Sequence, residues 1–339
     1  MIFSTTYDAA TEQVGSQFYR QLGALLIGLV VLTASLMIDY RAIVNRSLLI
    51  YGGLAACLLY TLWFGVEQGG AQRWIGLGVV NFQPSEFARL VVALVLAFIF
   101  AKDHRGSRRL SDWLIGIVIV GLPVFLIARQ PDLGSAATLL PVCIVIMLFA
   151  GLKPRVLAVL SVVAILAAPV VWAYGMEDYQ KTRIASFLDP EQDPRGAGYQ
   201  QIQARITVGS GGLTGRGFLQ GTQSQYDFLP VAHNDFIFSV LAEEHGFIGV
   251  LFTLGLYLFV VLRSLEAARL SKDRMGQYLV AGVLAGFTFQ VIYNVTMSAG
   301  LAPVKGLPLP LMSYGGSSVI ATLLGFGLIL NVRMRRFTN

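Results

Sequence analysis

The feature that most constrains this chain is a series of long apolar segments that recurs along the whole sequence. A helix that crosses a membrane needs about 20 mostly apolar residues, and these segments approach that length. They are continuously apolar, whereas a membrane barrel strand alternates apolar and polar residues, so they predict helices. The predicted spans are residues 22–38, 48–64, 87–101, 113–128, 136–150, 156–174, 247–262, 278–297 and 319–332. The sequence therefore predicts an all-α, polytopic integral membrane protein with about nine transmembrane helices.

Composition supports this class. Hydrophobic residues make up 55% of the 339 residues and charged residues only 13%, where a soluble domain has about 25% charged residues. The net charge of +6 is better read as an orientation signal than as a nucleic-acid site, so no nucleic-acid partner is predicted. Cys57 and Cys143 lie inside apolar segments, which argues against a disulfide framework or a thiolate metal site. No metal site or cofactor is predicted, and a divalent cation is left open.

Lys and Arg residues predict the orientation, because most of them lie in every second connection between the predicted spans. By the positive-inside rule these connections are cytoplasmic, so the C-terminus is cytoplasmic and, with nine spans, the N-terminus is outside. The basic residues concerned are Arg41, Arg46, Lys102, Arg105, Arg108, Arg109, Lys153, Arg155, Arg263, Arg269, Lys272, Arg274, Arg333, Arg335 and Arg336.

The outward loops are long enough to be informative. They cover approximately residues 65–85, 129–135, 175–234 and 298–318. Loops as long as 175–234 are either functional or disordered, and its mix of Gly, Arg, Asp, Tyr and Phe favours an ordered, functional loop. The chain shows no internal repeat, so we expect one transmembrane domain over residues 1–339 with a large extracytoplasmic loop at about 175–234.

Four motifs rich in Gly, Pro and polar residues lie in or beside these loops. The first is Arg73-Trp74 followed by Gln83-Pro84-Ser85-Glu86, and the second is Gln130-Pro131-Asp132-Leu133-Gly134. The third runs through the long loop as Gly198-Tyr199-Gln200, Gly209-Ser210-Gly211-Gly212, Gly221-Thr222-Gln223 and His233-Asn234-Asp235-Phe236. The fourth is Pro308-Leu309-Pro310 with Ser313-Tyr314-Gly315-Gly316-Ser317-Ser318.

In this order the motifs resemble those of the SEDS family (shape, elongation, division and sporulation) of peptidoglycan glycosyltransferases, over nearly the whole chain. The long-loop motif is similar to that of the elongation members rather than the division members. The resemblance implies polymerisation of lipid II into glycan strands on the outer face of the bacterial cytoplasmic membrane. It also implies a class B penicillin-binding protein as transpeptidase partner, and other membrane proteins of the elongation complex.

The chain departs from the family pattern at two informative places. Family members have roughly ten spans, so the resemblance implies that the first span is missing here, and an outward N-terminus fits that interpretation. Arg89 stands where the family usually has Lys.

Asp235 is the predicted catalytic residue. Strand growth requires a sugar hydroxyl to attack an anomeric carbon that carries a lipid-linked diphosphate, and a nearby carboxylate can remove the hydroxyl proton. Asp235 ends the long loop just before an apolar segment, so we expect it at the outer membrane surface. The resemblance implies that it is the key catalytic aspartate. The alternative is a helix cap, since Asn234 or Asp235 would suit the start of the next helix.

Cationic side chains are the predicted substrate contacts, because developing charge on a diphosphate must be stabilised. For each of them a structural or solvated role is the alternative. Arg73 beside Trp74 would also suit an interfacial anchor. Glu86 and Arg89 share a helix face and would either line the substrate cavity or form a structural ion pair. The candidates are Glu86, Arg89, Arg73, Arg183, Arg195, Arg205, Arg216 and Lys305.

Two motif features are interpreted structurally. The glycines of 209–217 favour turn formation over a phosphate-binding nest. Glu243 and Glu244 would either face the cavity or pair inside the protein.

Two other functions remain as alternatives. A flippase for lipid-linked precursors should show paired repeats and ionisable residues at the bilayer midplane, and the sequence shows neither. A scaffold that only recruits the penicillin-binding protein would not need an acidic residue at Asp235.

Overall fold

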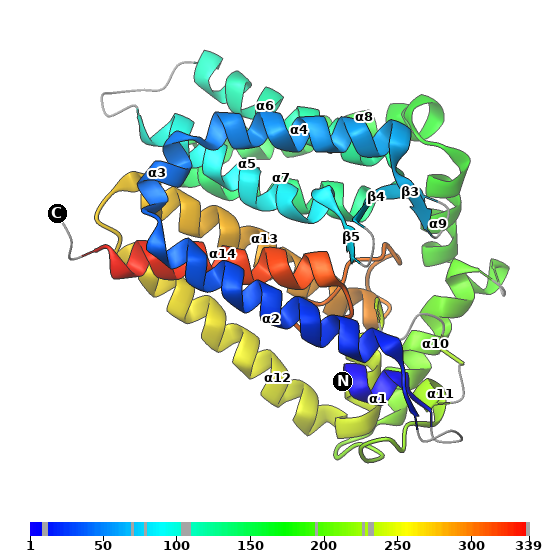
Figure 1. Ribbon diagram of the computed structural model, residues 1–339. Helices are drawn as coiled ribbons and strands as arrows, with labels where there is room; N and C mark the ends of the chain where they lie inside the picture. The colour runs from blue at the N-terminus through cyan, green and yellow to red at the C-terminus, as the bar shows by residue number, and fades with distance from the viewer. Residues whose placement is uncertain are drawn as a thin grey trace. The chain divides into compact units, whose positions relative to one another are not determined.

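The computed structural model describes residues 1–8, 13–68, 71–77, 80–102, 110–193, 196–225, 228–229 and 234–336. Helices dominate the described chain, and they fall on the predicted apolar segments (Figure 1). Seven described helices are long and apolar enough to cross a membrane: α2 (Ser16–Met37), α4 (Ser47–Phe64), α5 (Pro84–Ala101), α6 (Leu110–Arg129), α12 (Ile237–Arg269), α13 (Arg274–Ser298) and α14 (Gly316–Met334). The prediction of a helical, multi-pass membrane protein is confirmed.

The nine predicted spans differ in helix length. Two of the nine predicted segments form shorter apolar helices, α7 (Leu133–Phe149) and α8 (Pro154–Val170). A π-helix at Val171–Gly175 follows α8 directly. By length and composition, seven described helices could cross a membrane, and α7 and α8 are apolar but shorter.

The connections contain more regular structure than the sequence suggested. Strands β3 (Val66–Gln68), β4 (Ala71–Leu77) and β5 (Val80–Phe82) form a three-stranded antiparallel sheet in the loop 65–85. Strands β1 (Tyr7–Asp8) and β2 (Gln13–Val14) pair near the N-terminus. The apolar segments are helical as predicted. These strands lie in the connections and have only two to seven residues, so a search for long apolar segments does not find them.

The short helices lie outside the predicted spans. The segment 175–234 contains α9 (Asp178–Leu188), a 3₁₀ turn at Pro190–Gln192, α10 (Ala197–Ser210) and α11 (Thr222–Gln225). Helix α1 (Ile2–Thr6) opens the chain, and α3 (Tyr40–Asn45) connects α2 to α4.

The chain forms two compact units. The first, called the loop unit, comprises Met1–Gly15, Gly151–Gly255 and Ile292–Ser313; the second, called the bundle unit, comprises Ser16–Ala150, Leu256–Val291 and Tyr314–Asn339. Helices α12 and α13 each run from one unit into the other. The expectation of one domain over residues 1–339 stays a prediction.

The bundle unit is built around α5. This helix is buried along most of its length, whereas α2, α4 and α6 expose many apolar side chains, as helices that face lipid do. Helices α2 and α14 lie side by side (Figure 1), and Gly28 lies against the Leu323 side chain. Small residues at such contacts let helix backbones approach closely, which favours packing where lipid is as apolar as the side chains.

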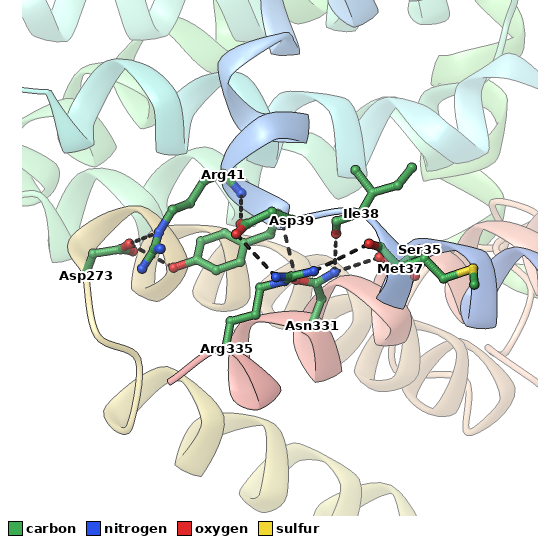
Figure 2. A network of polar contacts seen from close by, with 9 residues as sticks. Ser35, Met37, Ile38, Asp39, Arg41, Asp273, Asn331 and Arg335 are labelled. Atoms are coloured by element: carbon green, nitrogen blue, oxygen red, sulfur yellow. Dashed lines mark hydrogen bonds and ion pairs between the residues drawn. The ribbon is translucent and has the colours of Figure 1, made fainter. Parts of the chain in front are cut away.

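A network of polar contacts joins the ends of α2 and α14 to α3 (Figure 2). The buried Asn331 side chain lies at its centre. Its Nδ2 donates to the carbonyl oxygens of Ser35 and Ile38, both at 2.6 Å. Its Oδ1 accepts from the Tyr40 N–H at 3.2 Å and from Arg335 Nε at 3.1 Å. One side chain thus holds the chain reversal that follows α2.

Asp273 forms the other half of the network. Its Oδ2 accepts from the Tyr40 hydroxyl at 2.8 Å and from Arg41 Nε at 2.9 Å, and its Oδ1 accepts from the Gly276 N–H at 2.8 Å. Burial alone would raise the pKa of Asp273, but these hydrogen bonds and the charge of Arg41 lower it below its usual value. Asp273 therefore stays ionised and links α3 to the start of α13.

Replacing Asn331 tests the importance of this network. Asn331→Ala should lower the free energy of unfolding by about 3 kcal/mol, because buried carbonyls lose their donors. Thermal unfolding in detergent measures the change. Asn45→Ala, an exposed asparagine at the end of α3, is the matched control and should unfold with the wild type. Equal melting of both variants would show that the network contributes little.

Candidate active site

Asp235 lies in the loop unit, in a turn directly before α12, and is partly buried. Gly306 lies against its carboxylate: a Cβ added there would stand 3.5 Å from Asp235 Oδ2. Segments 71 residues apart in sequence (235 and 306) are therefore brought together. The carboxylate adjoins the segment that carries Lys305.

Two of the predicted cations, Lys305 and Arg183, belong to the same unit, and the charge of Arg183 acts on Lys305. Lys305 is partly buried, and burial together with the positive charge of Arg183 lowers the pKa of its ammonium group. Arg183 lies on α9 and is also only partly exposed. Two like charges held near each other would be stabilised by an anion, so this pair suits a phosphate group.

The remaining cations of the long loop differ in their surroundings. Arg205, on α10, is exposed, and its side chain covers Gly300. Arg216 is bound within its own loop: Nε donates to the Ser210 carbonyl at 3.3 Å and Nη1 to Thr222 Oγ1 at 3.0 Å. These contacts indicate a structural role for Arg216, and its predicted substrate contact stays a prediction. Arg195 and His233 lie outside the described residues.

Helix α12 is interrupted at Gly246, where φ is 62° and ψ is −165°. The glycine-rich segment 211–217 packs into the break. Its backbone pairs with helix groups on both sides of Gly246 through four hydrogen bonds: Phe247 N–H to Gly212 O at 2.9 Å, Ile248 N–H to Leu213 O at 3.1 Å, Arg216 N–H to Glu243 O at 2.9 Å and Gly217 N–H to Glu244 O at 3.0 Å. Gly209 lies inside α10, whereas Gly211 and Gly212 lie in a turn as predicted, and the backbone of the segment 211–217 pairs with the broken helix.

Close backbone approach explains why glycine occupies these positions. A Cβ at Gly211 would overlap the Ala242 carbonyl oxygen, and one at Gly246 would overlap the Gly215 amide nitrogen. The conformation of Gly246 is moreover one that only glycine adopts readily. The break coincides with the beginning of the predicted span 247–262, and the glycine after His245 was the available sequence signal.

Glu243 and Glu244 are buried beside this break. Glu243 Oε1 accepts from the Gln223 N–H at 2.9 Å, and Glu244 Oε1 accepts from the Leu219 N–H at 3.3 Å and from the Ser4 hydroxyl. Both carboxylates thus bind the loop that follows α10. Of the two roles considered for them, the internal one agrees with these contacts.

Glu86 and Arg89 lie in the bundle unit, on α5, and both are buried. Arg89 Nη2 is 3.8 Å from Glu86 Oε2 and donates to Thr322 Oγ1 at 3.0 Å, while Nη1 donates to Gln290 Oε1. Arg89 also lines a small, mostly apolar pocket with residues of α13 and α14. The ion pair is therefore real, and the predicted contact with substrate stays a prediction. Sequence reasoning missed Gln290 and Thr322, which lie in apolar helices.

Arg73 joins the first two motifs within the bundle unit. On β4, its Nε donates to the Gln130 carbonyl at 3.0 Å and its Nη2 to the Pro131 carbonyl at 2.6 Å. Asp132 Oδ1 accepts from the Ser135 N–H at 3.0 Å and so caps α7. These contacts give Arg73 a structural role, and its predicted substrate contact is untested.

Within the described parts of the chain, no group of three or more His, Cys, Asp or Glu side chains could hold a metal ion.

Comparison with known families gives a match over almost the whole chain. The family model FTSW_RODA_SPOVE, described as a cell cycle protein, matches residues 1–337. The peptidoglycan glycosyltransferase MrdB of Escherichia coli K12 is 38% identical over 330 residues, which cover 97% of this chain and 89% of MrdB.

Solved structures share the fold. One is a chain from a peptidoglycan synthase complex described as coordinating polymerization and crosslinking, with a TM-score of 0.86 and 33% identity. The other is the rod shape determining protein RodA of Thermus thermophilus, with a TM-score of 0.73 and 30% identity. In each case the match covers 99% of this chain and 94% of the other.

The break in α12 gives a prediction about stability. Gly246→Ala should lower the free energy of unfolding by about 3 kcal/mol or more, because alanine is strained in this conformation and its Cβ collides with the loop. Thermal unfolding in detergent is the measurement. Gly255→Ala in the same helix, where a Cβ would meet open space, is the control and should be neutral or slightly stabilising. A stable Gly246→Ala protein would contradict the packing described for the loop.

Proposed function

Because this chain belongs to the SEDS family of peptidoglycan glycosyltransferases, we propose that it polymerises lipid II on the outer membrane face with Asp235 as general base. The observation that carries the proposal is the proximity of the Asp235 carboxylate to the segment of Lys305 within one compact unit. A proton acceptor beside a cationic group suits transfer of a sugar from a diphosphate.

The proposed reaction uses Asp235 as the proton acceptor and Lys305 and Arg183 as the stabilising cations. The acceptor sugar hydroxyl attacks the anomeric carbon of the donor, and its proton passes to the Asp235 carboxylate as the new glycosidic bond forms. The bond from the anomeric carbon to the diphosphate oxygen breaks, and negative charge develops on the lipid-linked diphosphate. Lys305 and Arg183 stabilise that charge. Their partial burial strengthens the interaction, since fewer water molecules screen it.

The other predicted contacts complete the proposal. Glu86 and Arg89 line the substrate cavity, and Arg73, Arg195, Arg205 and Arg216 contact the substrate as it enters or leaves. For Arg73 and Arg216 this role would come in addition to the backbone contacts that they make.

We also propose a membrane topology. Helices α7 and α8 cross the membrane with the seven longer helices, which gives nine spans within one domain. The distribution of Lys and Arg puts the N-terminus outside and the C-terminus in the cytoplasm. The segment 175–234 is then extracytoplasmic, on the side where lipid II is polymerised.

The proposed partner is a class B penicillin-binding protein that crosslinks the strands, within an elongation complex of membrane proteins. Support comes from the similar chain that belongs to a peptidoglycan synthase complex.

Asp235→Asn tests the proposed base. Glycan-strand synthesis from purified lipid II, with the partner present, should fall by about 100-fold or more, because the amide cannot accept the proton. Asp178→Asn, an exposed carboxylate at the start of α9, is the control and should keep wild-type activity. A folded Asp235→Asn protein with the wild-type rate would exclude the base. Absence of polymer from the wild type itself would favour the scaffold or the flippase.

The lowered pKa of Lys305 predicts a pH dependence. A lysine is cationic below its pKa and neutral above it, so polymerisation should decline as the pH rises through a value below the usual lysine pKa. Lys305→Arg should move this decline to higher pH, because arginine stays charged. Rates from pH 7 to about 10.5 measure it, and Lys153→Arg is the control. An unchanged profile for Lys305→Arg would remove Lys305 from the diphosphate site.

A further inference from the structure

Asn294 connects two segments of the proposed active site. It lies on α13, and its side chain is fully buried. Its Nδ2 donates to the carbonyl oxygen of Asp235 and to that of Leu307, each at 2.8 Å. One amide group thus binds the main chain of Asp235 and also that of the segment that contains Gly306 and Leu307.

Asp235 precedes the first residue of α12, Ile237, and its carbonyl accepts from Asn294. In a longer helix the Ser239 N–H would pair with Asp235, four residues earlier. Here the Ser239 N–H donates to the Phe236 carbonyl at 2.9 Å, and the Val240 N–H donates to the same oxygen at 3.3 Å. Asp235 therefore stands just outside the helix, and Asn294 holds its peptide group.

The segment opposite Asp235 is held by the same helix. The Tyr293 hydroxyl donates to the Pro303 carbonyl at 2.8 Å, and Asn294 binds the Leu307 carbonyl. The residues between these two contacts include Lys305 and Gly306. Gly306, with a φ of 63°, faces the Asp235 carboxylate. Consecutive residues of α13 therefore fix both ends of the Lys305 segment.

We infer that Asn294 is a positioning residue, which sets the Asp235 carboxylate against the Lys305 segment so that both act on one substrate. The inference rests on the proposed role of Asp235. Asparagine suits the task because its amide nitrogen has two N–H donors on a short side chain. An aspartate there would present only acceptors to two carbonyl oxygens, and alanine would remove both of these hydrogen bonds.

Initial rates of strand synthesis at several lipid II concentrations test the inference. The purified full-length variants are Asn294→Ala, Asn294→Ser, Tyr293→Phe and Asp235→Asn. Thr296→Ala is the matched control, since its hydroxyl donates to the Ile292 and Tyr293 carbonyls of the same helix. Thermal unfolding in detergent establishes which variants fold.

A displaced base should slow the chemical step without weakening substrate binding. We expect kcat of Asn294→Ala to fall by about tenfold or more while KM changes by less than about threefold. Asn294→Ser, which keeps one hydroxyl donor, should be affected less. Tyr293→Phe frees only one end of the Lys305 segment and should also lose less than Asn294→Ala. Thr296→Ala should match the wild type.

Other results would overturn the inference. A folded Asn294→Ala protein with wild-type kcat would do so, as would a rise in KM alone. Loss of folding in both Asn294 variants would also do so, because the residue would then serve the fold rather than the geometry of Asp235. Failure of the proposed function is distinguishable: wild-type activity of Asp235→Asn would exclude the base whatever Asn294 does.

Discussion

Pairing of backbone polar groups is the constraint on which the loop unit depends. A helix next to lipid cannot leave N–H and C=O groups without partners, because no water is available to bind them. Helix α12 breaks at Gly246 and would expose such groups on both sides. The segment 211–217 supplies the missing partners from its own backbone. The long loop is consequently attached to the helix that begins just after Asp235, and the buried Glu243 and Glu244 bind the same loop.

Two buried asparagines, one in each unit, bind backbone carbonyl groups in the same way. Asn331 in the bundle unit and Asn294 in the loop unit each donate from one amide nitrogen to two carbonyl oxygens. The Ser35 carbonyl lies in the last turn of α2, and those of Ile38 and Asp235 lie just outside α2 and α12, where helical hydrogen bonding leaves backbone groups without helical partners. A short, uncharged side chain with two donors is enough to fix such a segment. At Asp235 this positions the side chain of the proposed base as well as the main chain.

The motifs that identify the family have different structural uses. Arg73, Gln130 and Asp132 come from two motifs, yet they bind backbone groups and one another at the start of α7. Glu86 and Arg89 instead form a buried ion pair whose further contacts come from uncharged side chains of α13 and α14. A charged residue in a connection between helices is therefore, on its own, a poor guide to substrate contact. Arg216 donates to the Ser210 carbonyl and to Thr222 Oγ1, whereas the charge of Arg183 lowers the pKa of Lys305.

The sequence by itself determined the membrane class, the positions of the spans and the family. Apolar segments report the solvent that a helix must face, and this property is local, so the segments 48–64 and 278–297 nearly coincide with α4 and α13. The choice of Asp235 as the proposed base came only from the resemblance. The tertiary structure alone decided that Gly306 lies against Asp235, that Asn294 binds Asp235 and Leu307, and that the glycines of 211–217 close α12. These contacts join residues far apart in the chain, and no local pattern of hydrophobicity or charge records which distant backbone group a side chain will bind.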